Sequence, residues 1–241
     1  MSLAVFLVDD LSRDQVRLTG AEGRHAAGAK RLRVGEQVEL VDGRGTRARC
    51  TVVEVARDDV LLAVGERRLE PAPSLRLVVV QALPKGDRGE LAVELMTEVG
   101  VDAVVPWAAA RCVVQWKGER GEKALRRWRS TAREASKQSR RSWVPEVHEA
   151  ASTKQVQELL AGATGFVLHE DAEVPLGSAP LPAEGDVVLV VGPEGGVTDD
   201  ELAAFSGAGA TAVRLGPTVL RTSTAGAAAA AVVSARTSRW A

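Results

Sequence analysis

Cysteine is scarce in this sequence of 241 residues: Cys50 and Cys112 are the only two, and they lie far apart with no CxxC or Cys/His spacing. This argues against a disulfide framework and against a zinc site, and favours two buried thiols in a reducing compartment. The three histidines share no metal-ligand spacing either. We therefore predict that the protein has no metal centre and that its histidines are structural, although His169 follows a predicted strand end and is placed to line a pocket.

The sequence also lacks a long hydrophobic segment. The longest apolar run, Ala225 to Val233, is far shorter than the roughly 20 residues that a membrane-spanning helix requires. Near the start of the chain, Asp9, Asp10, Arg13 and Asp14 interrupt any signal-peptide pattern. We therefore predict a soluble, cytoplasmic protein, and its 45% of apolar residues suffices for a sizeable core.

The chain as a whole has no excess of charge of either sign, since its net charge is −1, but one segment is strongly basic. Residues 111 to 145 hold eleven Lys or Arg and three acidic residues, a net charge of +8. From Glu119 to Arg141 the sequence has helical periodicity, with an apolar face that includes Leu125 and Trp128. A cationic stripe on another face is typical of a surface that binds a polyanion, and Trp116 and Trp143 are placed to stack on unpaired bases. The alternative is a solvated helix face.

Residues 1–70 have the pattern of a small antiparallel β-barrel. Short strands are predicted at Ala4–Val8, Gln37–Val41, Arg47–Val55 and Val60–Val64. Leu69–Ser74, with two prolines, then reads as a linker. A weaker basic cluster in this domain comprises Arg24, His25, Lys30, Arg31 and Arg33.

Residues 74–241 have the pattern of an α/β domain with a mostly parallel sheet, because strands alternate with helices. Leu75 to Leu83 reads as an apolar run and predicts a strand covered on both faces. Further strands are predicted at 101–107, 165–168, 187–191 and 212–215, and helices at 90–99, 119–141, 153–161, 201–206 and 224–235. The last helix is rich in alanine, which fits either high helix propensity alone or close packing against a neighbour.

A glycine loop, Gly192-Pro193-Glu194-Gly195-Gly196, directly follows the strand at 187–191, and Thr198 and Glu201 after it have capping-box spacing. Ligands of open α/β sheets bind beyond the carboxyl ends of the strands, and glycine lets a ligand approach the backbone closely. The loop matches neither GxGxxG nor the P-loop, and Glu194 would repel a phosphate, so a ligand with positive charge such as a sulfonium fits better. A tight structural turn is the alternative.

A second loop, Leu215 to Thr224, also lies between a strand and a helix and repeats the Gly-Pro pair as Gly216-Pro217. If both loops lie at one edge of the sheet, they form two walls of a single pocket. Arg221, just before a predicted helix start, then reaches toward the substrate, or is simply a surface arginine.

Taken together, these segments resemble the RsmE family of 16S rRNA (uracil-N3)-methyltransferases of the SPOUT class. The resemblance covers nearly the whole chain, and its order and spacing make it specific. Its pieces are Arg24-His25, 31–35, 85–88, 97–101, Arg127-Trp128, 134–141 with Pro145, 191–196, 215–217 and 220–222.

The resemblance implies an N-terminal PUA-like β-barrel and a C-terminal α/β domain with a deep trefoil knot. It also implies a homodimer that binds S-adenosylmethionine in the knot and methylates the uridine numbered 1498 in the 16S rRNA of the 30S subunit. At three positions the family often has another residue: Glu for Ser223, Arg for Thr218 and Lys for Leu95. Without a carboxylate at Ser223, no residue of the last loop is an assured general base.

The sequence thus predicts three sets of functional residues. The catalytic candidates are Arg221, as a fixed cation beside the uracil, and Glu194. The cofactor-binding candidates are Leu168, His169, Glu170, Gly192, Pro193, Glu194, Gly195, Gly196, Leu215, Gly216, Pro217 and Leu220. The RNA-binding candidates are Arg24, Lys30, Arg31, Arg33, Lys85, Arg88, Arg111, Arg126, Arg129, Arg133, Lys137, Arg140 and Arg141. The alternatives are another RNA target, or a non-catalytic RNA-binding module of ribosome assembly.

Overall fold

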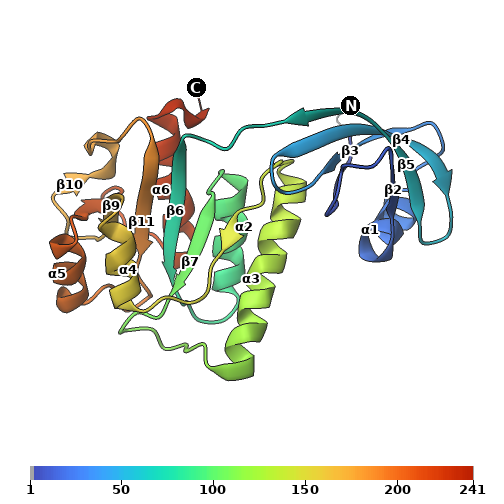
Figure 1. Cartoon of the computed structure of the whole chain (residues 1–241). Coiled ribbons are helices and arrows are strands. Elements are labelled where there is room, and N and C mark those ends of the chain that lie inside the picture. Colours follow the sequence, from blue (N-terminus) through green and yellow to red (C-terminus); the bar gives the residue numbers. More distant parts are fainter. Residues whose placement is uncertain (1–2, 241) are drawn as a thin grey trace. The chain divides into compact units, whose positions relative to one another are not determined.

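The computed structural model describes residues 3–240, which form two compact units (Figure 1). The first unit extends as far as Ala72 and also includes Ser136–Val144. The second comprises Pro73–Ala135 and the chain from Pro145 onward. Among the described residues, no helix combines the length and apolarity that crossing a membrane requires.

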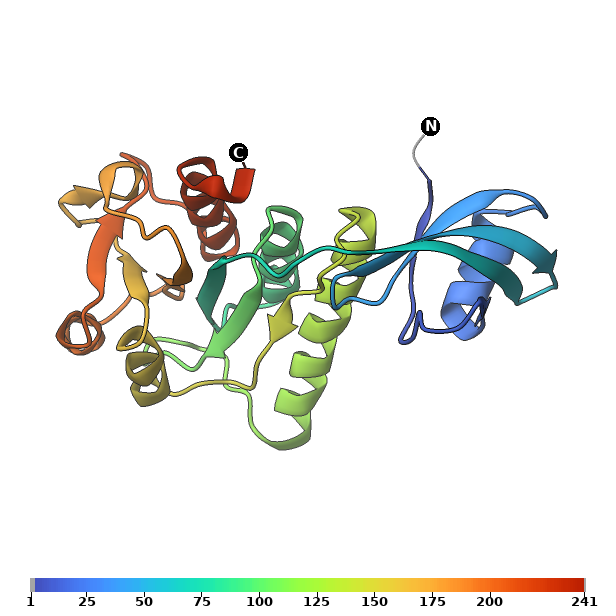
Figure 2. The ribbon, with the colours of Figure 1, turned by 45° about the horizontal axis from the view of Figure 1, so that its top comes forward.

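The first unit is built on a five-stranded curled sheet with the strand order β1-β3-β4-β5-β2. Figure 2 shows its long curved strands with α1 against them. The pairs are antiparallel except β1 with β3, which is parallel, so the predicted antiparallel barrel is wrong in this detail. The elements are β1 Val5–Leu7, β2 Gln15–Leu18, α1 Gly20–Arg24, the π-helix His25–Ala29, β3 Gln37–Val41, β4 Thr46–Val55 and β5 Val60–Leu69.

Alternating side chains of these strands form the core of the first unit. Phe6, Leu40 and Leu62 are fully buried there. The ring of His25 packs edge-on against Phe6, with 5.9 Å between the ring centroids, which agrees with a structural role for this histidine. Cys50 is buried as predicted, whereas Cys112, in the second unit, is only half-buried.

A short segment far along the sequence, Ser136–Val144, is part of the first unit. Backbone hydrogen bonds join Gly45 N to Ser142 O (2.9 Å) and Val144 N to Gly43 O (3.0 Å). Arg47 on β4 donates to the carbonyl of Arg140 and to the hydroxyl of Ser142. The first unit is therefore discontinuous in sequence.

The second unit contains a seven-stranded sheet with the order β10-β12-β9-β11-β6-β7-β8, and every pair is parallel. This confirms the predicted parallel α/β sheet. The strands are β6 Leu75–Ala82, β7 Ala103–Trp107, β8 Glu146–Val147, β9 Thr164–Leu168, β10 Val174–Pro175, β11 Gly185–Val191 and β12 Thr211–Arg214.

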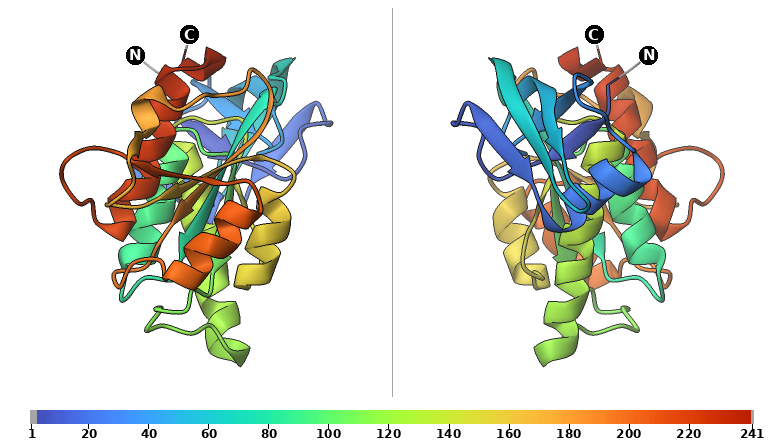
Figure 3. Two further views of the ribbon diagram at one scale, coloured as in Figure 1. Left: turned by 90° about the vertical axis from the view of Figure 1, so that its left-hand side faces the viewer. Right: turned by 90° about the vertical axis from the view of Figure 1, so that its right-hand side faces the viewer.

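Helices cover both faces of the seven-stranded sheet, as both views in Figure 3 show. Buried side chains of α2, α3 and α6 pack on one face, and those around α4 and α5 pack on the other. This explains why the central strands are apolar on both sides. The helices are α2 Arg88–Glu98, α3 Gly118–Gln138, α4 Thr153–Leu160, α5 Asp199–Gly207 and α6 Thr222–Ala235, with short 3-10 turns at Leu176–Ser178 and Ser238–Trp240.

The alanine-rich helix α6 packs closely against its own chain. A Cβ added at Gly226 would lie 2.8 Å from the sulfur of Met96 on α2 and 3.3 Å from a methyl group of Val79 on β6. Ala229 and Ala230 are fully buried. The small side chains thus let α6 approach both α2 and the sheet.

Candidate functional site

The two Gly-Pro loops lie at the same edge of the sheet. They follow β11 and β12, which flank β9 on either side in a wholly parallel sheet. The carboxyl ends of these strands therefore meet at one edge, together with the predicted segment 168–170 after β9. The loops are joined there by a hydrogen bond of 2.8 Å from the hydroxyl of Thr222, at the start of α6, to the carbonyl of Gly192.

The glycine loop presents its backbone to solvent at its tip. Gly195 and Gly196 are exposed, and Gly196 has a φ of 75°, a conformation that favours glycine. The loop closes with a 2.9 Å hydrogen bond from Gly196 N to Pro193 O. Arg111 lies over it and donates to the carbonyl of Gly195 at 2.9 Å. Arg111, a predicted RNA contact, therefore holds the glycine loop.

Glu194, within the same loop, is tied to the start of α2. Its carboxylate accepts hydrogen bonds of 3.2 Å from the backbone N–H of Lys85 and from the guanidinium of Arg88. Burial alone raises the pKa of Glu194, but the hydrogen bonds from its own backbone and from Lys85, and then the hydrogen bond and charge of Arg88, lower the pKa below the usual value. A carboxylate of this kind is a weak base, and its partners direct it toward α2.

The helix after the loop begins with the predicted capping box. Thr198 Oγ1 accepts from Glu201 N, and Glu201 accepts in return from Thr198 N. The Glu201 carboxylate, only 5% exposed, also accepts a 2.7 Å hydrogen bond from Ala110 N in the loop after β7. Sequence reasoning found the cap but missed this second role, because nothing in the spacing reveals a partner 91 residues away.

The second loop is exposed from Gly216 to Arg221, and Figure 3 shows it projecting from the second unit. Val219 is 75% exposed. Arg221 is the N-cap residue of α6, where its carbonyl accepts from Thr224 N and Ala225 N. Among the described residues, its guanidinium has no hydrogen-bond partner, so it is available to a ligand.

Gln81 is a polar residue of this edge that sequence reasoning missed. It lies on β6 opposite Val191 of β11, is fully buried, and donates from Nε2 to Thr222 Oγ1 at 2.9 Å. The signal was present, because Gln81 interrupts a run that we read as apolar. Its significance depends on Thr222, which is 141 residues away in sequence.

The basic helix α3 is more engaged than its sequence suggests. Lys137 is not part of an exposed stripe, because its ammonium is paired with Glu22 and its side chain is 8% exposed. Arg129 donates to the carbonyl of Val147 on β8 and to Glu149. Arg140 lies beyond the helix, which ends at Gln138, and has a φ of 57°. The predicted stripe over the whole segment is therefore wrong in its C-terminal part, whereas Arg126 remains on the exposed surface.

The two tryptophans predicted to stack on bases both contact protein. Trp116 packs edge-on against Trp128, with 4.9 Å between the ring centroids. Trp128 itself is 2% exposed and belongs to the core, as predicted. Trp143, in the first unit, donates its indole N–H to the carbonyl of Glu70. Each indole therefore has a contact within the protein, and both rings are partly exposed.

The basic cluster of the first unit is exposed. Arg24 ends α1, and the other three cations, Lys30, Arg31 and Arg33, follow the π-helix. Arg31 has a positive φ of 51°. Within this unit, the four side chains are free to contact a polyanion.

Comparison with known proteins identifies two domain families. The model of an RNA methyltransferase domain matches residues 70–234, and the model of an RNA methyltransferase PUA domain matches residues 18–64. The Ribosomal RNA small subunit methyltransferase E of Mycobacterium tuberculosis is 50% identical over 226 residues, which cover 92% of this chain and 86% of that protein. Its counterpart from Bacillus subtilis is 31% identical, with coverages of 86% and 85%.

Solved structures show the same architecture. A Ribosomal RNA small subunit methyltransferase E from Neisseria gonorrhoeae, bound to S-adenosyl methionine, superposes with a TM-score of 0.87 at 28% identity and covers 98% of each chain. A protein from Legionella pneumophila in complex with the bound cofactor SAM has a TM-score of 0.89 at 26% identity, with coverages of 98% and 99%.

Proposed function

Because this chain belongs to the Ribosomal RNA small subunit methyltransferase E family, we propose that it transfers a methyl group from S-adenosylmethionine to N3 of a uridine in 16S ribosomal RNA, at the position numbered 1498. The observation that carries this proposal is the meeting of two Gly-Pro loops with exposed tips at the carboxyl edge of one parallel sheet, joined through Thr222 and Gly192.

The residues at this edge fit S-adenosylmethionine. Exposed backbone at Gly195 and Gly196 lets a ligand approach closely. The proposed cofactor contacts are the segments 168–170, 192–196 and 215–217, together with Leu220. Two solved relatives hold this cofactor. When bound, it supplies a methyl group already activated by the sulfonium charge, so the chain needs no metal for activation.

The chain's own task is then to present and activate the uracil. The base must be unpaired or flipped out of its helix for N3 to be reached. N3 becomes nucleophilic only as its proton leaves, and negative charge then spreads to the two ring carbonyl oxygens. Arg221 is the proposed cation that stabilises this charge, more in the transition state than in the ground state.

Glu194 is a weaker candidate for the base that removes the N3 proton. Its carboxylate is held by Lys85 and Arg88, and its pKa is lowered. We therefore assign Glu194 to holding the glycine loop.

Proposed RNA contacts come from each unit separately. In the first unit they are the exposed cluster Arg24, Lys30, Arg31 and Arg33, with Arg140 and Arg141. In the second they are Lys85, Arg88, Arg111, Arg126, Arg129 and Arg133. Side chains engaged within the protein, such as Arg129 and Arg88, contribute less than the exposed ones.

The resemblance that led to these assignments also implies a homodimer and a trefoil knot. Exposed apolar side chains on α2 and in the second loop support a second copy as the partner: Leu91 is 43% exposed, Val219 75% and Leu220 39%. Val219 and Leu220 are adjacent in the chain, and contiguous exposed apolar surface marks interaction sites.

Calorimetry tests the cofactor, and mass spectrometry tests the substrate. We expect one S-adenosylhomocysteine to bind per chain, and we expect 16S rRNA from a deletion strain to lack a single N3-methyluridine. Heat with NAD or ATP but none with S-adenosylhomocysteine contradicts the methyltransferase. Cofactor binding with an unchanged 16S rRNA and a lost methyl group elsewhere selects another RNA target. RNA binding without methyl transfer selects the non-catalytic assembly module.

A further inference from the structure

A buried chain of hydrogen bonds runs from the carboxyl end of β6 to the glycine loop. Gln81 lies on β6, and its Nε2 donates to Thr222 Oγ1 at 2.9 Å. Thr222 begins α6, and its hydroxyl donates to the carbonyl of Gly192 at 2.8 Å. Gln81 is fully buried and Thr222 is 6% exposed, so solvent does not compete for these bonds.

Chemistry fixes the direction of this chain. The carbonyl of Gly192 can only accept, so the Thr222 hydroxyl uses its single proton there and must accept from Gln81. The same amide nitrogen of Gln81 donates to the carbonyl of Ala82 at 3.1 Å. Gln81 therefore cannot turn its amide over without losing both bonds, and its Oε1 is left as a buried acceptor without a partner among the described residues.

A buried, unpartnered acceptor destabilises a fold, and the surrounding strand positions are apolar. Leu77 and Val79, which point to the same face of β6 as Gln81, belong to the hydrophobic core. A leucine at position 81 would remove the unpartnered acceptor, so packing alone does not explain the glutamine. What only the glutamine provides is the donor to Thr222.

We propose that Gln81 and Thr222 are positioning residues that hold the two cofactor loops together. Thr222 immediately follows the second loop, and Gly192 begins the first, so the chain fixes the separation of the two walls of the pocket. This inference rests on the proposed function, since it concerns the same cofactor. It predicts that the hydrogen bonds from Gln81 through Thr222 to Gly192 affect cofactor affinity and not the methyl-transfer step.

The test compares Thr222→Val, Thr222→Ser and Gln81→Leu with the wild type. By calorimetry with S-adenosylhomocysteine, we expect Thr222→Val and Gln81→Leu each to weaken binding about tenfold, because each interrupts the chain between β6 and the glycine loop. Thr222→Ser keeps the hydroxyl and should restore the affinity. In turnover assays KM for S-adenosylmethionine should rise similarly, while kcat at saturating cofactor stays within about twofold.

Two further variants separate positioning from general loss of stability. Thr97→Val removes another buried threonine hydroxyl, which donates to Val93 O within α2, and should leave cofactor affinity unchanged. The double variant Gln81→Leu/Thr222→Val should bind as well as either single variant, because both substitutions break one chain.

Several results overturn this inference. One is a Thr222→Val variant that binds S-adenosylhomocysteine as tightly as the wild type. Another is a double variant whose loss of affinity equals the sum of the two single losses. A third is a variant in which kcat falls while KM is unchanged. If Gln81→Leu does not fold, the valine and serine variants at Thr222 decide alone. A wild-type protein that binds no S-adenosylhomocysteine refutes the proposed function itself, which is a different outcome from a variant that binds as well as the wild type.

Discussion

Arg221 is exposed at the end of the second loop, and its backbone is held by the start of α6. Its carbonyl caps α6 through Thr224 N and Ala225 N, while its guanidinium has no hydrogen-bond partner among the described residues. We expect Arg221→Ala to lower the methylation rate by roughly 10²–10³, the range for losing one preorganised donor. Cofactor affinity should change little, which calorimetry checks.

Arg236 provides a matched control for this substitution. It lies at the other end of α6, where it donates to the carbonyl of Leu176. Arg236→Ala should leave the methylation rate near that of the wild type. If Arg221→Ala instead turns over normally, the arginine is not the proposed cation, and if it loses the cofactor, the residue belongs to the binding loop.

Glu194 gives a prediction about pH. A carboxyl whose folded pKa is lowered contributes stability above its unfolded pKa, near 4.3, and loses it as the pH falls through the folded pKa. The Glu194 carboxylate therefore stays ionised, and keeps the glycine loop tied to α2, from neutral pH down to about pH 5. Cofactor affinity should be constant over this range and weaken only in more acidic solution, where Glu194 takes up a proton. Arg88→Ala should raise the pKa of Glu194, which a carboxyl NMR titration measures.

Lys85 is the control for this titration. It interacts with Glu194 through its backbone N–H, so Lys85→Ala keeps the hydrogen bond and should leave the pKa of Glu194 near its wild-type position. A pKa that moves with Lys85 and not with Arg88 would show that the guanidinium is not the side chain that matters.

Residues of the site divide into those that adjacent sequence reveals and those that it does not. The glycine loop, the capping box and Arg221 at a helix start were predictable, because each depends on neighbours in the chain. Gln81 and the second role of Glu201 were not, because their partners are 141 and 91 residues away. Lys137 was assigned to RNA because the sequence shows its charge but does not show that it pairs with the distant Glu22.

At the scale of elements, the two capping boxes differ in what their second residue contacts. Gln155 at the start of α4 is exposed, and among the described residues its hydrogen bonds are to Ser152 in its box. Glu201 is buried and also holds Ala110 N. We expect Glu201→Ala to lower the free energy of unfolding by about 2 kcal/mol or more, and Gln155→Ala by at most about 1 kcal/mol.

Urea unfolding measures both variants. Similar losses in the two would mean that the Ala110 bond contributes nothing to stability. Hydrogen exchange at the Ala110 amide is the direct readout, because only Glu201→Ala should accelerate it.

Elements with a strong pattern were predicted and weak ones were missed. The central strands of the second unit and all five helices α2 to α6 were found, with ends that differ by up to three residues, whereas β5 continues past its predicted end at Val64 to Leu69. β2 was missed because Gln15–Leu18 is short and mostly exposed, and α1 because its sequence contains two glycines in five residues. Periodicity also carries no information on strand order, so the parallel pairing of β1 with β3 was out of reach.

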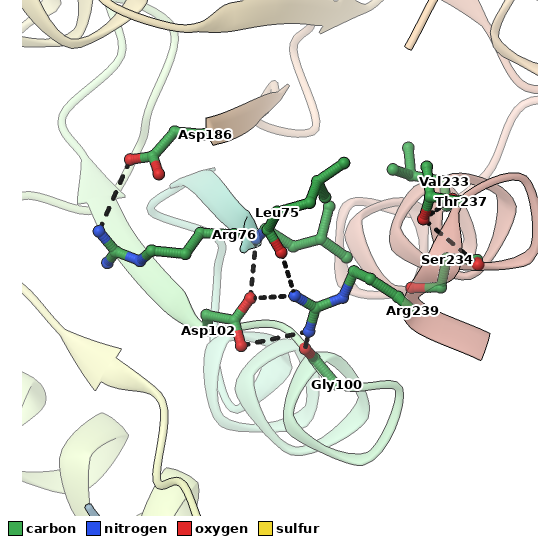
Figure 4. A network of polar contacts seen from close by, with 10 residues as sticks. Leu75, Arg76, Gly100, Asp102, Asp186, Val233, Ser234, Thr237 and Arg239 are labelled. Carbon is green, nitrogen blue, oxygen red and sulfur yellow. Dashed lines mark hydrogen bonds and ion pairs between the residues drawn. The ribbon is translucent and has the colours of Figure 1, made fainter. Parts of the chain in front are cut away.

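At the scale of the whole chain, contacts between distant segments close each unit. Residues 136–144 lie in the first unit although most of the sequence around them belongs to the second. In the second unit, Arg239 near the end of the chain contacts Leu75, the first residue of β6 (Figure 4). It donates to Leu75 O and to Asp102 Oδ2, both at 2.6 Å, and to Gly100 O.

This network joins three places in the sequence. Asp102 lies between α2 and β7 and also accepts from Leu77 N at 2.8 Å. Both charged side chains are mostly buried, at 11% and 12% exposed. Removing one partner leaves the other charge buried and unpaired, so Arg239→Met should lower the free energy of unfolding by about 3–5 kcal/mol.

The neighbouring ion pair in Figure 4 is the matched control, because it joins β6 to β11 with its atoms farther apart and more exposed. Arg76 and Asp186 are 3.6 Å apart, with side chains 44% and 31% exposed. Arg76→Met should cost at most about 1 kcal/mol. In the double variant Arg239→Met/Asp102→Asn, the loss should be smaller than the sum of the single losses, because each substitution already breaks the shared pair. Equal losses for Arg239→Met and Arg76→Met, or strictly additive losses in the double variant, would show that Arg239 does not close the second unit.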